Sequence, residues 1–457
     1  MSTTVEYKNN VITTVENETK VLTTSGKWME DDITLTDVSG GASGGEVEKQ
    51  INFIDYDGAV VASYTAEEWA SVTALPANPS HDGLTAQGWN WTKAQIDAEL
   101  QAIPEDNIYV GQMYITESGD TEIDIDLASA YRRVYFQCAV NGSVSLDWGD
   151  GTSAITVTGT SLTSRKANYH NYTNAGKYTI TVSVSSGTFN FYGVYSSNST
   201  IRIPPVSSGD TSAYSISRNS ALASSIMAIR LGNNAGIGKY GLYYCLRLKY
   251  ITLPKTTTNI DNYAIYQCLT LVQLTIPTSI TDIPEYCISS SAVESICLPP
   301  GILSIGSDAF YDLERLARIH IPNGITTIGT NALGTSYGIK KLVIPGSIEI
   351  ISSSIGGQPA YIILKDGITT IGTGSSVFSS SNLLRVDIPE TVTSIGDSAF
   401  TGLGIVEYHI RANNVPTLGT SAFTAISTMK IFVPEESVDA YKAATNWSSY
   451  ESYIVGE

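Results

Sequence analysis

The sequence has few charged residues, few cysteines and few methionines, and it contains no long apolar run. Of its 457 residues, 15% are charged, and Cys and Met each occur only five times. Because a membrane-spanning helix needs about 18 or more consecutive apolar residues, we expect none here. Hydrophobic residues still make up 42% of the chain. The chain is therefore globular, and its length predicts several domains.

The cysteines and histidines do not follow the spacing of metal ligands. A disulfide framework or a zinc site would need regular cysteine spacing, which is absent from Cys138, Cys245, Cys268, Cys287 and Cys297. The four histidines fall on separate segments: His81, His170, His320 and His409. We expect no metal and no cofactor. Cys245 and Cys268 share one phase of a repeat, which favours stacked buried thiols over a redox pair.

Motifs of the common enzyme classes are also missing. We find no nucleophile motif and no phosphate-binding loop. Asp55 and Asp57 precede Gly58 in a turn, and this is too little for a catalytic carboxylate pair. We therefore expect a protein that is not an enzyme, with glycan hydrolysis by an unrecognised carboxylate pair as the alternative.

The negative charge is concentrated in the first part of the chain. The net charge is −18, and residues 1–118 hold 19 acidic against five basic residues. Such a balance excludes bulk nucleic-acid binding. The start, MSTTVEYKNN, has neither a basic nor an apolar segment, so we expect no signal peptide. The end, YESYIVGE, carries no anchor motif.

A repeated phrase dominates the second half of the sequence. The segments LPPGILSIGSDAF (298–310) and IPETVTSIGDSAF (388–400) are near copies. Steps of 20 to 24 residues separate the positions that follow each predicted strand: Leu231, Pro254, Pro277, Pro299, Pro322, Pro345, Lys365, Pro389 and Ala412. A period of this length predicts a solenoid.

Each position of the repeat has a structural role. Apolar residues alternate before the Pro, as in Leu274 and Ile276, which predicts a strand with one buried side. Further apolar residues, such as Ile302 and Ile305, are expected to point inward, and Phe310 should enter the core from a short turn. Where Gly follows, we expect a left-handed corner: Gly238, Gly306, Gly329, Gly372, Gly396 and Gly419.

These repeats resemble the BspA-like family of leucine-rich repeats over roughly 225–457. The ending VPEESVDAYKAATNW (433–447) resembles the last unit of such arrays, which implies a capping helix beginning near Glu435–Ser437. Lys365 in place of Pro and the longer IGTGSSVF loop depart from the pattern. They loosen the repeat register locally.

Residues 119–205 resemble a polycystic-kidney-disease (PKD) domain, which is an immunoglobulin-like β-sandwich. The resemblance rests on VSLDWGDGTS and YTNAGKYTITV. It implies a turn at Trp148–Gly151 that joins two strands. Asp147 and Asp150 are expected to stabilise that turn through side-chain hydrogen bonds. Ca²⁺ binding by these two residues is the alternative. His170 is expected to be structural.

Residues 46–118 resemble the small β domains of internalin-type surface proteins. The segment FIDYDG and the later GW carry the likeness, which extends to a segment of structural proteins in Gram-positive phages. We expect Trp69, Trp89 and Trp91 to fill a small core, with a sugar-stacking platform as the alternative.

Residues 1–38 resemble short N-terminal segments of phage tail and baseplate proteins. They are followed by the flexible Gly/Ser linker SGGASGG at residues 39–45. The predicted order is an attachment segment (1–38), the linker (39–45), a small β domain (46–118), a PKD-like sandwich (119–205) and capped leucine-rich repeats (206–457). The fold class is mainly β and multidomain.

The resemblances imply a phage virion structural protein, in a tail fibre, baseplate or appendage, that displays the repeats for host attachment. The N-terminal region would contact other virion proteins, and the partner would be a polysaccharide or protein of the host surface. We expect a homo-oligomer. The alternative is an extracellular adhesin on a bacterial cell surface, of the BspA-like class.

The binding surface is predicted on the exposed face of the repeat strands. Residues two and four positions before each Pro point away from the core. Arg318, Lys341 and Arg385 form a cation cluster there, which would suit an anionic polymer whose sugars stack on tyrosines; an ordinary solvated face is the alternative. The candidate residues are Tyr250, Arg318, His320, Lys341, Tyr361 and Arg385.

Overall fold

The computed structural model divides the chain into two compact units, residues 1–48 and 49–457. In the first unit it describes the backbone of an antiparallel sheet with the order β1 (Thr4–Tyr7), β2 (Asn10–Val15), β3 (Glu18–Val21). In the second it describes residues 50–128, 132–193, 225–352, 354–372, 376–378, 383–401 and 407–457. The linker and most of the predicted attachment segment lie outside the described residues.

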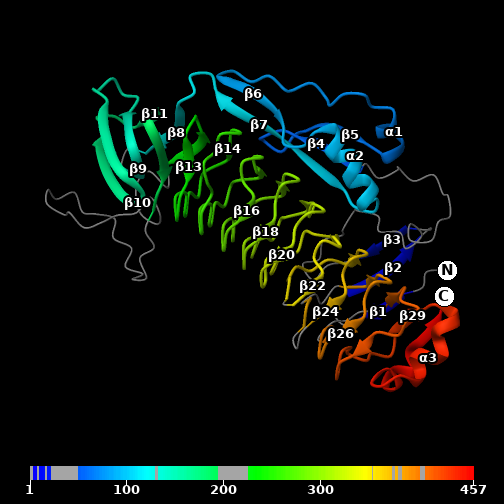
Figure 1. Cartoon of the computed structure of the whole chain (residues 1–457). Coiled ribbons are helices and arrows are strands. Elements are labelled where there is room, and N and C mark those ends of the chain that lie inside the picture. Colours follow the sequence, from blue (N-terminus) through cyan, green and yellow to red (C-terminus); the bar gives the residue numbers. More distant parts are fainter. Residues whose placement is uncertain are drawn as a thin grey trace. The chain divides into compact units, whose positions relative to one another are not determined.

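Residues 50–116 form a small domain with one mixed sheet and two helices (Figure 1). The sheet has the order β5 (Val60–Tyr64), β4 (Ile51–Ile54), β7 (Ile108–Thr116), β6 (Leu84–Trp89). Helices α1 (Ala66–Ala70) and α2 (Lys93–Ala102) each follow a threonine whose side chain caps the first turn. The small β domain expected for residues 46–118 therefore also contains two helices. Capping boxes at Thr65/Glu68 and Thr92/Gln95 were the sequence signals for these helices.

The small domain has its own hydrophobic core. Trp69, Trp89 and Trp91 are buried in it together with Phe53 and Ile96. Trp69 and Trp89 pack against Phe53 with ring centroids 5.8 and 4.9 Å apart. The prediction that these tryptophans fill a core is confirmed.

Residues 121–191 form a sheet of long strands that continues into the solenoid. Its order is β10 (Ile155–Asn171), β9 (Arg133–Asp147), β11 (Gly176–Phe191), β8 (Thr121–Leu127). Strand β8 then pairs with the first solenoid strand β12 (Ile226–Arg230), and the end of β11 pairs with β13 (Ala235–Ile237). The side chains of this sheet belong to the same core as the repeats. The sheet therefore covers the N-terminal end of that core. That residues 119–205 form a PKD-like sandwich stays a prediction.

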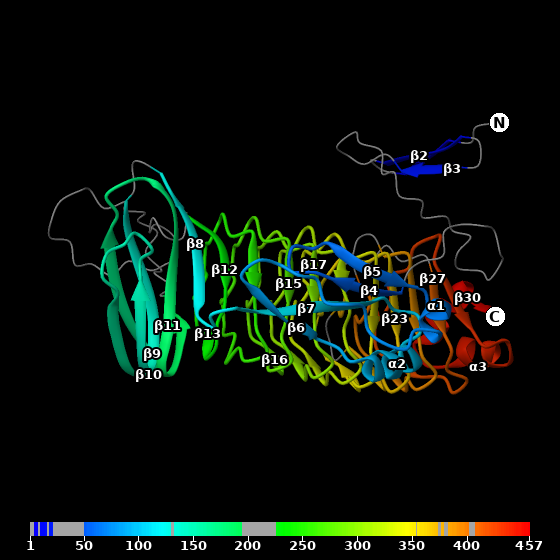
Figure 2. The same cartoon turned by 90° about the horizontal axis from the view of Figure 1, so that it is seen from above.

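The repeats build a solenoid with two rows of parallel strands, which we call front and back (Figures 1 and 2). After β12, the front strands are β14 (Tyr250–Thr252), β15 (Gln273–Thr275), β17 (Ser295–Cys297), β19 (Arg318–Ile319), β21 (Lys341–Ile344), β23 (Tyr361–Leu364), β25 (Arg385–Ile388), β27 (Glu407–Ile410) and β29 (Lys430–Val433). After β13, the back strands are β16 (Asp282–Ile283), β18 (Ser304–Ile305), β20 (Thr327–Ile328), β22 (Ile350–Ile351), β24 (Thr370–Ile371), β26 (Ser394–Ile395) and β28 (Thr417–Leu418).

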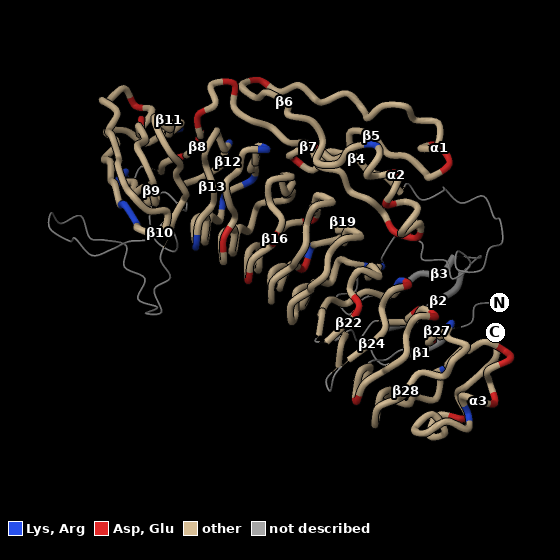
Figure 3. Tube along the Cα trace, in the orientation of Figure 1, with Lys and Arg blue, Asp and Glu red and all other residues tan. Residues whose placement is uncertain are grey.

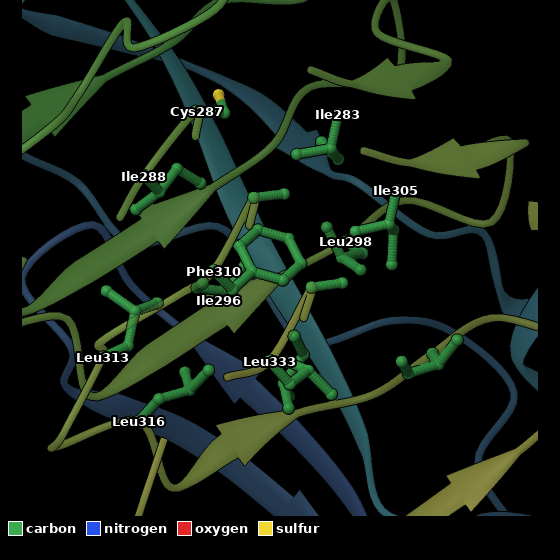
Figure 4. Packing of buried hydrophobic residues seen from close by; sticks show 14 of the residues in the cluster. Ile283, Cys287, Ile288, Ile296, Leu298, Ile305, Phe310, Leu313, Leu316 and Leu333 are labelled. Atoms are coloured by element: carbon green, nitrogen blue, oxygen red, sulfur yellow. The ribbon is translucent and has the colours of Figure 1, made fainter. Parts of the chain in front are cut away.

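The expected inward positions form the core between the two rows (Figure 4). Ile302, Ile305 and Phe310 are each at most 1% exposed. Equivalent side chains stack from coil to coil, as Phe400 does on Phe423 with ring centroids 5.6 Å apart. The solenoid prediction is confirmed, and the chain is mainly β.

The glycine corner is confirmed at one of the six predicted positions, Gly372, where φ is +74°. The other five do not adopt left-handed φ: Gly238, Gly306, Gly329, Gly396 and Gly419. A Cβ at Gly329 or Gly419 would lie 2.3 or 2.2 Å from a backbone nitrogen of the preceding coil, so Gly permits close stacking there. The left-handed residues come two positions later, with φ between 52° and 59°: Tyr240, Tyr263, Tyr286, Asp308, Asn331, Ser398 and Ser421.

A C-terminal cap closes the last coil, as predicted. The 3₁₀ turn η2 (Glu435–Ser437) leads into α3 (Val438–Ala443), and a second 3₁₀ segment, η3 (Trp447–Tyr453), leads into β30 (Ile454–Gly456). The Trp447 indole and the Tyr441 hydroxyl donate to carbonyl oxygens of the last coil at 2.8 and 2.6 Å. Strand β30 pairs with β29, so the cap covers the edge of the front row.

Candidate interaction surface on the front strands

The predicted site residues lie along the outer side of the front strands. Tyr250, Arg318, Lys341, Tyr361 and Arg385 each begin a front strand, and His320 directly follows β19. Core residues such as Ile251 and Ile319 alternate with them. The orientation predicted from alternation is therefore confirmed. The expectation that this whole side is open was wrong, because the small domain covers part of it.

Strand β7 of the small domain runs along the row of coils and crosses the front strands one after another (Figure 2). It contacts β14, β15, β17 and β19. The approach is closest at Gly111, where a Cβ would lie 2.2 Å from the Thr275 hydroxyl oxygen and 2.8 Å from the Cys297 Cβ. A residue with any side chain would thus be excluded from position 111 by the solenoid.

His320 is buried at this interface between two carboxylates of the small domain. Its Nδ1 lies 2.8 Å from Asp106 Oδ2, and its Nε2 lies 3.0 Å from Glu99 Oε1. His320 is 3% exposed, and the two acids are 5% exposed each. Burial alone would lower the pKa of His320, but the hydrogen bonds and charges of Asp106 and Glu99 outweigh it and raise this pKa from 6.5 to about 9. The imidazolium therefore holds the small domain in place and is closed to external ligands.

Figure 3 shows acidic positions, in red, around α2 of the small domain. Two solenoid lysines contact Glu105, which lies in the loop after α2. Lys341 Nζ donates to the Glu105 carbonyl oxygen at 2.6 Å. Lys365 Nζ lies 2.8 Å from Glu105 Oε2. Arg385 pairs with Asp387 on its own strand at 2.8 Å. Two of the three cations of the predicted cluster, Lys341 and Arg385, therefore already have partners within the chain. The three cations do not form an open cluster, and their binding of an anionic polymer stays a prediction.

Neutral hydrogen bonds complete the interface. The Asn90 amide donates to the carbonyl oxygens of Ile276 and Cys297 at 3.2 and 3.0 Å. The Trp91 indole donates to the Leu298 carbonyl oxygen at 2.8 Å. At the other end, the rings of Tyr250 and Tyr56 meet edge to face, with centroids 5.6 Å apart. The predicted site residue Tyr250 is thus part of this contact.

Strands β23 to β29 present a second group of outward residues beyond these contacts. The His409 ring stacks on Phe432 with centroids 4.5 Å apart, and its Nδ1 lies 2.7 Å from Glu457. Half-buried side chains on the same side are Tyr361, Ile363, Arg385, Glu407, His409 and Phe432. We call these six residues the open front surface. It combines aromatic rings with charges of both signs, which is a composition suited to carbohydrate or protein ligands.

The turn of the PKD-like segment is held by its own hydrogen bonds. Asp147 accepts from the Gly149 amide at 2.9 Å, and Asp150 accepts from the Thr152 hydroxyl at 2.6 Å. Asp150 also contacts His170 Nε2 at 2.7 Å, and the His170 ring stacks on Trp148. Within the described residues, no three acidic, His or Cys side chains are grouped to hold a metal ion.

The five cysteines are free and buried. Burial raises the pKa of Cys138 and Cys268 to about 12. Such thiols are inert at neutral pH. Cys245 and Cys268 lie in the solenoid core, which agrees with the structural interpretation of this pair.

Comparison with known proteins identifies the repeats. Residues 235–355 and 359–449 match the BspA type leucine rich repeat region family, in six copies. The C-terminal solenoid is therefore of the leucine-rich repeat type, and it is similar to the BspA type region over these residues. No curated protein matches the chain. In the described part of the chain, no helix is long and apolar enough to span a membrane.

Solved structures of leucine-rich repeat proteins are similar to parts of the chain. One from Bacteroides ovatus is 23% identical, with a TM-score of 0.33, over 46% of this chain and 63% of that protein. One from T. pallidum is 20% identical, with a TM-score of 0.28, over 50% of this chain and 91% of that protein. A leucine-rich cell surface protein from Faecalibacterium prausnitzii is 16% identical, with a TM-score of 0.23, over 45% of this chain and 74% of that protein.

Proposed function

We propose that this protein is a non-enzymatic adhesin displayed on a bacterial cell surface. The observation that carries the proposal is the six-copy match to the BspA type repeat region. That match supports the adhesin alternative and gives no support to a virion role. The virion role, the phage-like attachment segment and a homo-oligomeric state stay predictions from the sequence.

We place ligand binding on the open front surface. The stack of His409 on Phe432 offers aromatic faces to a sugar ring. Tyr361 lies two strands away, on β23, and the Arg385–Asp387 pair on β25 offers polar groups between them. A polysaccharide or protein of another cell would fit this combination. The earlier candidates Arg318 and Lys341 are not required for this proposal.

The test is binding of the purified chain to immobilised cell-surface polysaccharides and to whole cells, at two salt concentrations. The variant Tyr361→Ala/Arg385→Ala/Phe432→Ala should bind at least about tenfold more weakly, because each lost aromatic or charged contact contributes on the order of 1 kcal/mol. Tyr337→Ala is the matched control, since Tyr337 is 51% exposed and lies in the turn before β21. Equal binding by the triple variant would remove the open front surface as the site.

A further inference from the structure

A column of tyrosines lines the turns that follow the first three positions of the back row, which are β13, Ile260 and β16. The rings of Tyr240, Tyr263 and Tyr286 lie face to face, with successive centroids 4.9 and 4.8 Å apart. Each of the three side chains is half-buried, so part of every ring lies at the surface. We call these three residues the tyrosine ladder.

The backbone conformation of the ladder is unfavourable for tyrosine. The three residues have φ of 57°, 59° and 53°, a left-handed region that bulky side chains rarely adopt. Later coils place small polar residues at the same position: Asp308, Asn331, Ser398 and Ser421. The repeat therefore folds without tyrosine here, and a strained residue that recurs in three neighbouring coils points to a function.

The stacking determines which groups the ladder offers to a ligand. Both faces of the Tyr263 ring are covered by its neighbours, so this ring cannot stack on a sugar. It offers its edge and a hydroxyl group, which can donate a hydrogen bond. Such donors suit the carbonyl oxygens of a polyproline II segment, because that conformation has no internal hydrogen bonds.

The length of the ladder also matches a polyproline II helix. This helix rises about 3.1 Å per residue with three residues per turn, so one turn covers about 9 Å. Two steps of the ladder, of 4.9 and 4.8 Å, cover nearly the same length. Residues i and i+3 of the segment would therefore meet Tyr240 and Tyr286, and the residues between them would pass Tyr263.

The charges beside the ladder differ between its two ends. Asp308 is hydrogen-bonded to Tyr286, and the charge of Glu285 also acts on this tyrosine. At the other end, Lys239 Nζ lies 5.5 Å from the centroid of the Tyr240 ring. A basic residue of a ligand would therefore be attracted to the Tyr286 end and repelled from the Tyr240 end.

We propose that the tyrosine ladder binds a proline-rich protein segment in the polyproline II conformation, with a basic residue of that segment against Glu285 and Asp308. Aromatic surfaces are the usual docking sites for such segments. The ladder belongs to the turns after the back row and shares no residue with the open front surface. The proposal does not depend on the adhesin function.

The experiment is binding of fluorescein-labelled peptides to the native full chain, followed by fluorescence anisotropy. The probes are nine prolines with two arginines at either end, the same peptides with glutamates in place of the arginines, and a Gly/Ser peptide with two arginines. One arginine–proline peptide should bind at least about fivefold more tightly than its glutamate counterpart and than the Gly/Ser peptide. Equal binding of all probes, or no binding of any, would overturn the proposal.

Two variants assign the binding to the ladder. Tyr240→Asn/Tyr263→Asn/Tyr286→Asn introduces the residue that Asn331 provides at the same left-handed position, so circular dichroism should show a folded chain. This variant should bind the peptide at least about tenfold more weakly. Glu285→Lys changes one exposed residue and should remove the preference for arginine over glutamate, which provides a second test on a fully folded surface.

Matched controls separate the ladder from other surfaces. Tyr169→Ser alters a tyrosine of β10 that is 61% exposed, and it should bind the peptide as the wild type does. Tyr361→Ala/Arg385→Ala/Phe432→Ala should also leave peptide binding unchanged, so the two sites are tested independently. Unchanged peptide binding by the ladder variant would contradict the proposal. Binding of cellohexaose that the ladder variant loses, without binding of any proline peptide, would make the ladder a carbohydrate site instead.

Discussion

Replacing His320 by alanine is expected to weaken docking of the small domain by about 3–5 kcal/mol at pH 7, because Glu99 and Asp106 then stay buried without their cation. Hydrogen exchange of the Asn323 and Lys255 amides, which donate to Glu99 and Gln87 of the small domain, measures this loss. The expected result is fast exchange at these two amides with unchanged protection in β25 and β27. Unchanged protection of both amides would contradict it.

His409→Ala is the matched control for His320. His409 also contacts two carboxylates, Glu457 at 2.7 Å and Glu407 at 3.2 Å. These acids are 40% and 42% exposed, so water replaces the lost partner. The change should cost less than about 1 kcal/mol.

The same cluster predicts a pH dependence with a definite sign. The pKa of His320 is raised from 6.5 to about 9 by docking. Its stabilising contribution is therefore complete below about pH 6.5 and is lost as the pH rises through about 9. The facing groups are Glu99 from α2 and Asp106 from the loop after it, while Arg318 and Cys297 lie on the solenoid side. Protection of the Asn323 amide, which donates to Glu99 across the interface, should fall in the wild type between pH 7 and pH 10, and His320→Ala should flatten this dependence.

Phe400→Ala is expected to lower the free energy of unfolding of the solenoid by about 3–5 kcal/mol, since it leaves a cavity in a stacked column. Phe400 is fully buried. Its ring lies between those of Phe378 and Phe423, at centroid distances of 6.1 and 5.6 Å. Urea denaturation of the wild type and the variant, followed by far-UV circular dichroism, measures the change.

The control for this prediction is Leu303→Ala. Leu303 precedes a back strand in an equivalent coil but is 51% exposed, so its loss should cost about 0.5 kcal/mol or less. Equal destabilisation by the two changes would mean that the Phe column does not carry the stability assigned to it.

The solenoid could be predicted because its information is local and repeated. Residues such as Ile302 and Phe310 recur in each coil with the same neighbours, so the period and the alternation define the two rows and their core. The glycine corners were misplaced for a physical reason. Sequence shows that a side chain is absent at Gly329 or Gly419, but it does not show whether φ or the backbone of the preceding coil requires that absence.

The covered front face could not be predicted from the repeat alone. Gly111, Glu99 and Asp106 lie some 200 residues before His320 in the sequence, and no local pattern links them. One signal was present in the charge distribution, since residues 1–118 hold most of the excess negative charge. An acidic module beside solenoid strands that carry Lys341 and Lys365 favours an electrostatic contact within the chain.

The central claim is that the small domain lies on the front strands of the solenoid, and zero-length carbodiimide crosslinking tests it most directly. Glu105 Oε2 lies 2.8 Å from Lys365 Nζ, so an amide bond between these residues should appear in the native chain and diminish in Gly111→Ala. The Lys93–Asp97 pair, at 2.9 Å within the small domain, should crosslink in both. A wild-type chain that yields the Lys93–Asp97 crosslink without a Glu105–Lys365 crosslink would contradict the account.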